Sequence, residues 1–367
     1  MSRDRHRPGD SRSPGLGGVV RSVLRPLGRA HDHGHAHGRG HGHHHSHSHS
    51  HGRGLAGHAE DTSQVGIRAL AVSLVGLGVT AVLQLVIVVL SGSVALLADT
   101  IHNFADALTA VPLWCAFVIG RRPPTRRYTY GFGRAEDLAG VFIVLVIAVS
   151  AAVAGYEAVH RLLHPREVTD LGWVIAAGVV GFAGNELAAL HRLRVGRRIG
   201  SAALVADGLH ARTDGLTSLA VVLGGIGTAA GIERADPLVG LLITVMILGV
   251  LRGAARDIYH RLMDGVDPAL VERIERTLGQ VAGVDRVDSV RVRWVGHRLH
   301  AEAEIVSAPS LSLAEAHDIA ETARHELLHA EPRLHQALLH TSPGTDGVDP
   351  HARVAHHATL PAPAPSG

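Results

Sequence analysis

The stretch LLADTIHNFADALT, residues 96–109, places three ionisable side chains, Asp99, His102 and Asp106, inside a long apolar segment. No Arg stands beside them to neutralise the two acids. Burying such groups costs several kcal/mol unless they are paired or bound to something. The stretch therefore indicates that these side chains bind a partner inside an apolar layer.

That layer is predicted to be a lipid bilayer, which a helix of about 20 apolar residues can span. Six segments qualify, although polar residues interrupt the fifth and the sixth has a shorter apolar core. They are Val65–Leu90, Val94–Ile119, Leu138–Val159, Leu171–Leu190, Ala202–Ala230 and Leu238–Val250, the last extended to about Ala255. The sequence thus predicts a transmembrane domain over residues 65–258, with six helices.

Loop charges predict the orientation of these helices, because cytoplasmic loops are enriched in Arg and Lys. The loop RRPPTRRYTYGFGR after the second segment holds five Arg, and HRLRVGRR after the fourth holds four. The loops RLLHPREVTD and GIERAD have few Arg, offset by acids. Both termini are therefore expected in the cytoplasm, and the first 64 residues contain no apolar core of a signal peptide.

The residues from 264 to 342 have a different character and predict a small cytoplasmic α+β domain. Asp267 and Pro268 are typical of a helix start, and Ser312 with Glu315 forms a capping box. Strands alternate at period two, with Gly296 near the turn between the first two. The predicted elements are a helix over 267–284, strands over 287–295 and 298–306, a helix over 312–332 and a strand over 334–342. The order αββαβ favours a ferredoxin-like sheet.

Histidine is unusually frequent, with 29 residues in a chain of 367, and it gathers near the N-terminus. The segments 1–64 and 343–367 lack apolar periodicity and are expected to be disordered. Within the first, a tract is predicted to collect metal ions, since neutral imidazole is a common ligand of Zn²⁺, Cu²⁺ and Ni²⁺; a solvated tether is the alternative. The tract contains His31, His33, His35, His37, His41, His43, His44, His45, His47, His49 and His51.

The opening motif recurs in the fifth segment, where ADGLHARTDGLT echoes ADTIHNFADALT. Asp207, His210 and Asp214 repeat the first three ionisable groups at a displacement of 108 residues. Residues three and four apart lie on one helical face, and the two helices run antiparallel, so the stripes can face each other. A hydrogen-bond network between helices is the alternative use of such groups, but the repetition favours a metal site.

The predicted ligands are two imidazoles and two carboxylates, which suit a tetrahedral ion such as Zn²⁺. They are His102, Asp106, His210 and Asp214. Asp99 and Asp207 lie about one turn away and are expected either to orient the imidazoles or to act as entry ligands. The single cysteine, Cys115, excludes a disulfide framework and a Cys-rich metal cluster.

Residues 65–342 combine three features: the paired His-x-x-x-Asp motifs, the stretch YTYGFGRAEDLAG before the third segment, and the αββαβ domain that follows the six helices. By these features they resemble the cation diffusion facilitator family. The resemblance implies a homodimeric antiporter that exports divalent cations, usually zinc, in exchange for protons. It places His102, Asp106, His210 and Asp214 at the transport site. It also implies a charge lock between subunits at Arg134 and Asp264, and a cytoplasmic metal site at Asp288, His300, His317 and His340, to which His297 is added as a candidate.

The expected function is therefore proton-coupled export of Zn²⁺ across the inner or plasma membrane, with Cd²⁺, Co²⁺, Ni²⁺, Fe²⁺ or Mn²⁺ as alternative cargo. The expected partners are metal ions, protons, lipid and a second copy of the chain, with no nucleic acid and no organic cofactor. A membrane-anchored metal sensor or storage protein is the alternative function. The six apolar segments contain no His-Glu-x-x-His motif, which argues against an intramembrane metalloprotease; the HELLH stretch at residues 325–329 lies in the second predicted helix of the cytoplasmic domain.

Overall fold

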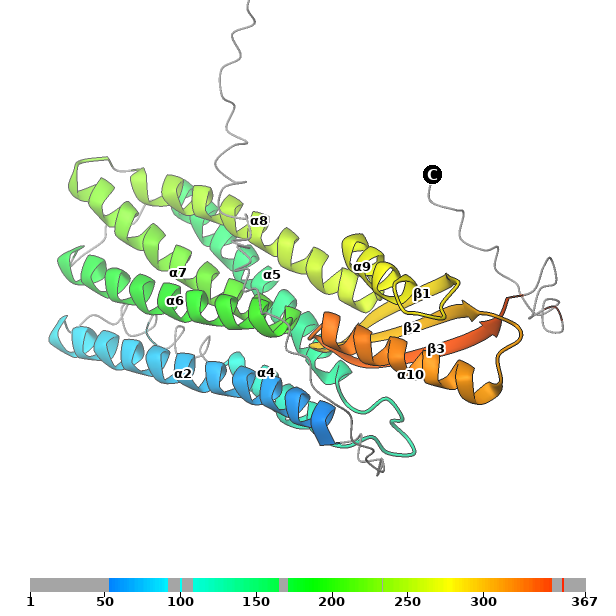
Figure 1. Cartoon of the computed structure of the whole chain (residues 1–367). Helices are drawn as coiled ribbons and strands as arrows, with labels where there is room; N and C mark the ends of the chain where they lie inside the picture. Colours follow the sequence, from blue (N-terminus) through cyan, green and yellow to red (C-terminus); the bar gives the residue numbers. More distant parts are fainter. Residues whose placement is uncertain are drawn as a thin grey trace, which may run out of the picture. The chain divides into compact units, whose positions relative to one another are not determined.

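A computed structural model describes residues 53–91, Thr100, 108–164, 171–232, 234–344 and Ala352, with side chains from Thr62 onward. Figure 1 shows its elements in chain order. They are α2 (Arg53–Ser91), α4 (Ala110–Gly120), α5 (Arg134–Leu163), α6 (Leu171–Ile199), α7 (Ala202–Ala229), α8 (Ala235–Leu262), α9 (Pro268–Gly279), β1 (Arg286–Val295), β2 (Arg298–Ser307), α10 (Leu313–Ala330) and β3 (Leu334–Pro343). The first copy of the motif (Asp99, His102, Asp106) and the His-rich tract lie outside the described residues.

The chain is a helical membrane protein with a C-terminal α+β domain, as the sequence predicts. Four described helices, α2, α5, α6 and α8, are long and apolar enough to cross a membrane. The second predicted span ends in α4, a shorter apolar helix. α7 is 28 residues long and corresponds to the fifth predicted span, Ala202–Ala230. Its first half carries Asp207, Arg212 and Asp214, the charged residues that interrupt this apolar segment.

The helices extend beyond the predicted spans. α2 begins at Arg53 instead of Val65, and α8 runs from Ala235 to Leu262. The prediction of a loop at HRLRVGRR was wrong, because α6 continues through it to Ile199. Arg and Leu are good helix formers and this stretch contains no Pro, so nothing in it ends the helix where the apolar run stops.

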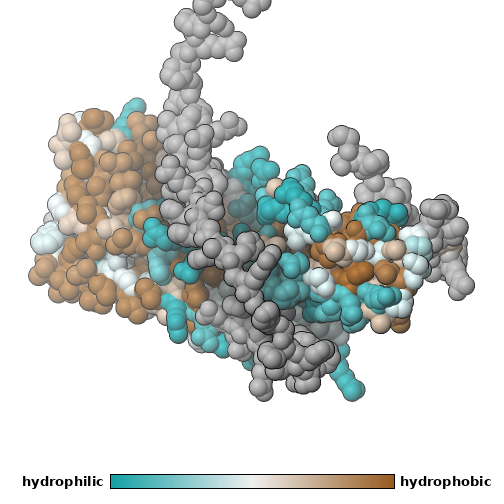
Figure 2. All heavy atoms as spheres, in the orientation of Figure 1, coloured by the Kyte–Doolittle hydropathy of each residue, from teal (hydrophilic) through white to brown (hydrophobic). Residues whose placement is uncertain are grey.

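The outer surface of the helical bundle is apolar. Large side chains such as Val75, Val89, Leu145 and Val245 are each at least 60% exposed. Figure 2 shows the corresponding broad hydrophobic surface over the bundle, whereas hydrophilic and hydrophobic residues are mixed on the face of the C-terminal domain in view. Such a surface would be costly in water and is expected where lipid surrounds the helices.

The inner helix contacts are made through small residues. On α6, a Cβ at Gly184 would lie 2.1 Å from Oγ1 of Thr80 on α2, and a Cβ at Gly181 would lie 2.8 Å from Nε2 of Gln84. The Gln84 amide donates to the carbonyl oxygen of Ala177, also on α6. Close backbone approach of this kind is typical of membrane helices, whose association depends on packing and not on apolar burial.

The predicted αββαβ order is confirmed in the C-terminal domain. β1 and β2 pair antiparallel and β2 and β3 pair parallel, in the order β1-β2-β3. Asp267 caps α9 ahead of Pro268, and Ser312 with Glu315 forms the predicted capping box of α10. Gly296 turns between β1 and β2 with a positive φ of 60°, a conformation that favours glycine.

The domain core lies between one face of the sheet and the two helices. Buried residues on β2, among them Leu299 and Ile305, pack with Leu278 of α9 and Leu327 of α10. α9 contacts β1, α10 contacts β3, and the two helices contact each other, so both cover the same face. The opposite face carries the alternate residues of each strand.

A Gly184→Ala substitution tests the close contact between α2 and α6. The added Cβ would overlap Thr80, and overpacking of this kind typically costs about 1–3 kcal/mol. We expect a clearly lower midpoint of thermal unfolding for the detergent-purified protein. Gly76→Ala on α2 is the matched control, because its Cβ would meet no atom within 4 Å. Equal midpoints for the two variants would contradict the packing described.

Candidate metal transport site

α7 presents the second copy of the motif as a single polar stripe. Asp207, His210 and Asp214 follow one another at spacings of three and four residues, so they lie on one helical face. Ser201 caps the helix by accepting a hydrogen bond from the backbone N–H of Leu204, which fixes where the helix begins. The stripe therefore has a defined place along the bundle.

His210 and Asp214 lie close together on α7, four residues apart. Nδ1 of His210 is 3.5 Å from Oδ1 of Asp214, and the side chains are 1% and 11% exposed. Within the described residues, neither ring nitrogen of His210 has a hydrogen-bond partner. A buried imidazole without partners is costly, so the donor pair suits a ligand such as a divalent cation.

Asp207 is placed differently, in an ion pair with Arg192 of α6. The distance from Nη1 of Arg192 to Oδ2 of Asp207 is 3.0 Å, and both side chains are almost completely buried. Nε of Arg192 also donates to Oγ of Ser73 at 2.8 Å, which joins α2 to the pair. Ser73 in turn donates to backbone carbonyl oxygens of its own helix. The Asp207 charge is thus neutralised by the protein itself.

Sequence reasoning missed Arg192, because it was counted among the charges of a cytoplasmic loop. The structure buries it in α6 instead, whereas Arg194, Arg197 and Arg198 of the same stretch are exposed. One feature of the sequence points to its burial. Arg192 lies seven residues, or about two helical turns, after Asn185, so both polar residues lie on the same buried face of α6. That signal is weak without the partner in view.

In the C-terminal domain, His297 is engaged in hydrogen bonds at both ring nitrogens. Nδ1 lies 2.7 Å from Oε2 of Glu136 on α5, and Nε2 lies 3.2 Å from Oγ of Ser63 on α2. Its ring is also 5.8 Å from that of Phe117. A metal ion at His297 would have to displace one of these hydrogen bonds, and no local sequence pattern predicts either of them.

The other candidates of this domain occupy separate places. His300 on β2 is opposite Gln336, whereas His340 on β3 is opposite Glu304, so the two are offset by four residues, or roughly 13 Å at the usual rise of a strand. His317 is exposed on α10, and Asp288 pairs with Arg286. Within the described part of the chain, no three His, Cys, Asp or Glu side chains gather closely enough to hold a metal ion.

His300 has a further neighbour that sequence reasoning did not single out, namely His335. The ring centroids are 5.8 Å apart. Burial, followed by the charges of Arg293 and Arg298, lowers the pKa of His300. Burial and then the charge of Arg298 lower the pKa of His335 to about 4. Both imidazoles are therefore neutral near pH 7, which is the form that can bind a metal.

Arg134 and Asp264, the expected charge lock, form an ion pair within one chain. Nη2 of Arg134 is 2.7 Å from Oδ1 of Asp264, and both side chains are almost half exposed. Asp264 follows α8 with a positive φ of 53°, the left-handed conformation common after a helix end. Nη1 of Arg134 also lies 3.4 Å from Oδ2 of Asp137. A lock between two subunits stays a prediction.

Comparison with known proteins adds independent findings. The family of the cation efflux transmembrane domain matches residues 70–263, and that of the cation efflux protein cytoplasmic domain matches residues 266–344. A probable cation efflux system protein of Mycobacterium tuberculosis (strain ATCC 25618 / H37Rv) is 62% identical over 287 residues, which cover 78% of this chain and 86% of that protein.

More distant relatives are also similar over most of their length. Metal tolerance protein 2 of Oryza sativa subsp. japonica is 28% identical over 77% of this chain and 78% of its own. The manganese efflux system protein MneS of Bacillus subtilis (strain 168) is 24% identical over 71% of this chain and 90% of its own. The names of all three relatives refer to cations or metals.

A double-mutant cycle tests the buried pair of Arg192 and Asp207. Removing one partner of a buried ion pair typically costs about 3–5 kcal/mol, because the other charge is left uncompensated. We therefore expect Arg192→Met and Asp207→Asn each to lower the thermal unfolding midpoint strongly. The double variant should recover a substantial part of that loss. Strictly additive effects would show that the two side chains do not stabilise each other.

Proposed function

The chain belongs to the cation efflux family, the cation diffusion facilitators, and on that premise we propose that it exports divalent cations, Zn²⁺ foremost, in exchange for protons. The observation that carries the proposal is the buried pair of His210 and Asp214, whose imidazole has no hydrogen-bond partner within the described residues. The sequence repeats this pair as His102 and Asp106. Together they form the proposed four-ligand site.

The donor set favours Zn²⁺ over Mn²⁺. Two imidazoles and two carboxylates suit a tetrahedral ion of intermediate softness, whereas sites made only of oxygen ligands favour Mn²⁺. Some relatives are named manganese efflux proteins, but these are 24% identical to this chain. The chemistry of the ligands is the better guide to the cargo here.

The charge balance at the site supports the transport of a dication. Arg192 neutralises Asp207, so Asp207 adds no net charge next to the ligands. Asp106 and Asp214 then supply two negative charges, which match one divalent cation. A site that is nearly neutral when loaded keeps the cost of charge at the middle of the membrane low.

Proton exchange follows from the same ligands. Coordination needs neutral imidazole, so a cation that enters from the cytoplasm displaces protons from His102 and His210. Protons that enter from the other side compete with the cation and release it. Histidine suits this exchange because its unperturbed pKa is about 6.5.

The proposal also covers the orientation of the chain in the membrane, its oligomeric state and its His-rich tract. Residues 264–342 and both termini lie in the cytoplasm, the membrane is the inner or plasma membrane, and the active form is a homodimer. The tract His31–His51 raises the local metal concentration at the cytoplasmic entrance.

Flux into proteoliposomes tests the transport site. We expect Asp214→Asn to lower the initial rate of Zn²⁺ uptake by more than about 100-fold, since changes even outside the ligand shell cost roughly 10–100-fold in metal affinity. Asp318→Asn, which removes an exposed acid on α10, is the control and should leave the rate unchanged. Undiminished Zn²⁺ uptake by the Asp214→Asn variant would refute Asp214 as a ligand. Absence of Zn²⁺ uptake by the wild-type chain and the Asp318→Asn control would favour a metal sensor over a transporter.

The coupling ion is tested by imposing a pH gradient on the same vesicles. An acidic interior should accelerate Zn²⁺ uptake and a protonophore should abolish the acceleration, because inward metal movement is balanced by outward protons. Empty liposomes correct for leakage. A rate that does not depend on the gradient would exclude proton exchange while leaving metal transport intact.

Deletion of residues 1–52 tests the His-rich tract. If the tract only concentrates metal near the entrance, the deletion should raise the KM for Zn²⁺ and leave kcat unchanged. The wild-type chain in the same lipid is the reference. A lower kcat at saturating Zn²⁺ would instead indicate a direct part in the transport cycle.

A further inference from the structure

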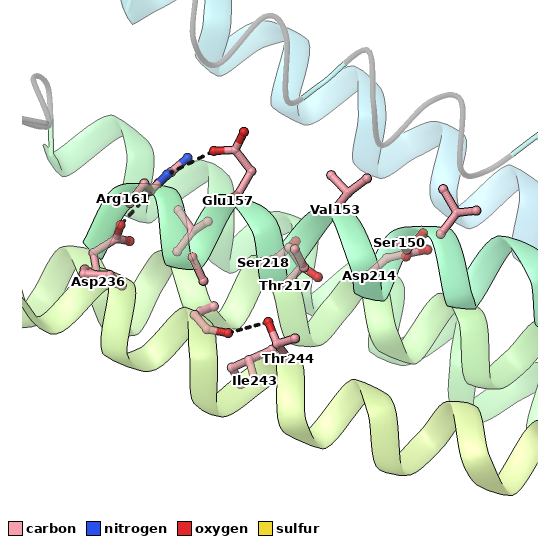
Figure 3. A pocket seen from close by; sticks show the side chains of 17 residues that line it. Ser150, Val153, Glu157, Arg161, Asp214, Thr217, Ser218, Asp236, Ile243 and Thr244 are labelled. Atoms are coloured by element: carbon pink, nitrogen blue, oxygen red, sulfur yellow. Dashed lines mark hydrogen bonds and ion pairs between the residues drawn. The ribbon is translucent and has the colours of Figure 1, made fainter. Parts of the chain in front are cut away.

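A cavity of about 270 Å³ lies between α5, α7 and α8 and reaches the transport site. Its deep end is formed by Ser150 and Asp214, which Figure 3 shows side by side. Its other end is formed by Glu157, Arg161 and Asp236. Ser150 and Arg161 are eleven positions apart on α5, which is roughly 16 Å of helix, so the cavity extends from Asp214 towards one end of the bundle.

That end is the one away from the C-terminal domain. α5 ends at Leu163, just past Arg161, and α8 begins at Ala235, next to Asp236, whereas the C-terminal domain follows the other end of α8. In the proposed orientation, this is the extracytoplasmic side of the membrane. The cavity therefore lies where a cation released from His210 and Asp214 would have to pass.

Three charged side chains meet at the outer end of the cavity. Nη1 of Arg161 is 3.2 Å from Oδ2 of Asp236, and its Nε is 3.6 Å from Oε2 of Glu157, as the dashed lines in Figure 3 show. Arg161 thus joins the last turns of α5 to the first turn of α8. A Cβ at Gly224 would lie only 2.5 Å from Oδ1 of Asp236, so α7 also packs tightly against this cluster.

The wall between the two ends carries hydroxyl groups. Oγ1 of Thr217 donates to the carbonyl oxygen of Thr213, and Oγ1 of Thr244 donates to that of Gly240. A hydroxyl whose proton is engaged by the backbone offers oxygen lone pairs to a neighbouring group. Ser150 and Ser218 add two further hydroxyls to the lining. The wall therefore offers oxygens to a passing cation.

We infer that this cavity is the release route of the cation and that Arg161 is its gate, an inference that rests on the proposed function. With Arg161 between Glu157 and Asp236, the two carboxylates are satisfied and a positive charge stands across the route. A cation that reaches this end can replace Arg161 as the partner of the two carboxylates. Because the ion pairs are partly exposed, they are weak enough to exchange.

Cysteine accessibility in the full-length protein tests the gate without measuring transport. The sole native thiol is removed by Cys115→Ser, and Ser150→Cys then reports from the deep end of the cavity. A membrane-impermeant thiol reagent is added to the extracytoplasmic side. We expect Arg161→Gln to accelerate labelling of Ser150→Cys at least tenfold and Arg161→Lys to restore most of the slow rate.

Two further variants sharpen the test. Leu145→Cys, on the exposed apolar side of the same helix, is the control reporter, and its labelling should not respond to Arg161→Gln. Glu157→Gln breaks the other contact of Arg161 and should accelerate labelling of Ser150→Cys as well, which keeps the test valid if Arg161→Gln does not fold. Labelling rates that ignore both substitutions, or labelling only from the cytoplasmic side, would overturn the inference.

The outcome separates this inference from the proposed function. Zn²⁺ transport together with unchanged labelling would refute the gate and leave the exporter standing. Accelerated labelling without Zn²⁺ transport in proteoliposomes would refute the exporter and retain Arg161 as the residue that closes the cavity.

Discussion

The cost of holding charge inside a membrane is the constraint on which this structure depends. α7 carries Asp207, His210 and Asp214 on one face, whereas its Arg212 pairs with Glu186 of α6. Asp207 is neutralised by Arg192, which also reaches Ser73 on α2. His210 and Asp214 lie together one turn further along α7, and the proposed function assigns the cation cargo to this pair. Arg192 is engaged by Asp207 and Ser73, so only His210 and Asp214 of this face are proposed as ligands.

Close helix packing makes such an arrangement possible. Gly181 and Gly184 let α2 approach α6, and that approach holds Ser73 within reach of Arg192. At the far end of the bundle, Gly224 lets α7 pack against Asp236. The same kind of contact therefore supports both the buried pair near the transport site and the charged cluster at the end of the cavity.

The sequence predicted the features that depend on local pattern. Apolar runs marked the membrane helices, the alternation of strands marked β1 and β2, and Asp267 and Ser312 marked the helix starts in the C-terminal domain. It also singled out His210 and Asp214, because the spacing of the motif repeats. These predictions need only neighbouring residues in the chain or a direct repeat.

What the sequence did not predict depends on long-range contacts. Arg192 sits in a stretch that resembles an Arg-rich loop, and only the packing of α6 against α7 turns it towards Asp207. His297 was expected as a metal ligand, but α5 and α2 bring Glu136 and Ser63 to its two ring nitrogens. The cavity that ends at Arg161 forms where residues 149–161 of α5 lie against residues 214–244 of α7 and α8. No local pattern records such neighbours.

X-ray absorption at the zinc edge directly tests whether His210 belongs to a four-coordinate Zn²⁺ site. The Zn²⁺-loaded protein without residues 1–52 is compared with its His210→Gln variant, so that metal on the cytoplasmic domain cancels in the difference. A four-ligand site that includes His210 predicts a difference spectrum of nitrogen and oxygen ligands at about 2.0–2.2 Å, with imidazole scattering and four-coordinate geometry. Identical spectra and equal zinc content in the two proteins would contradict it.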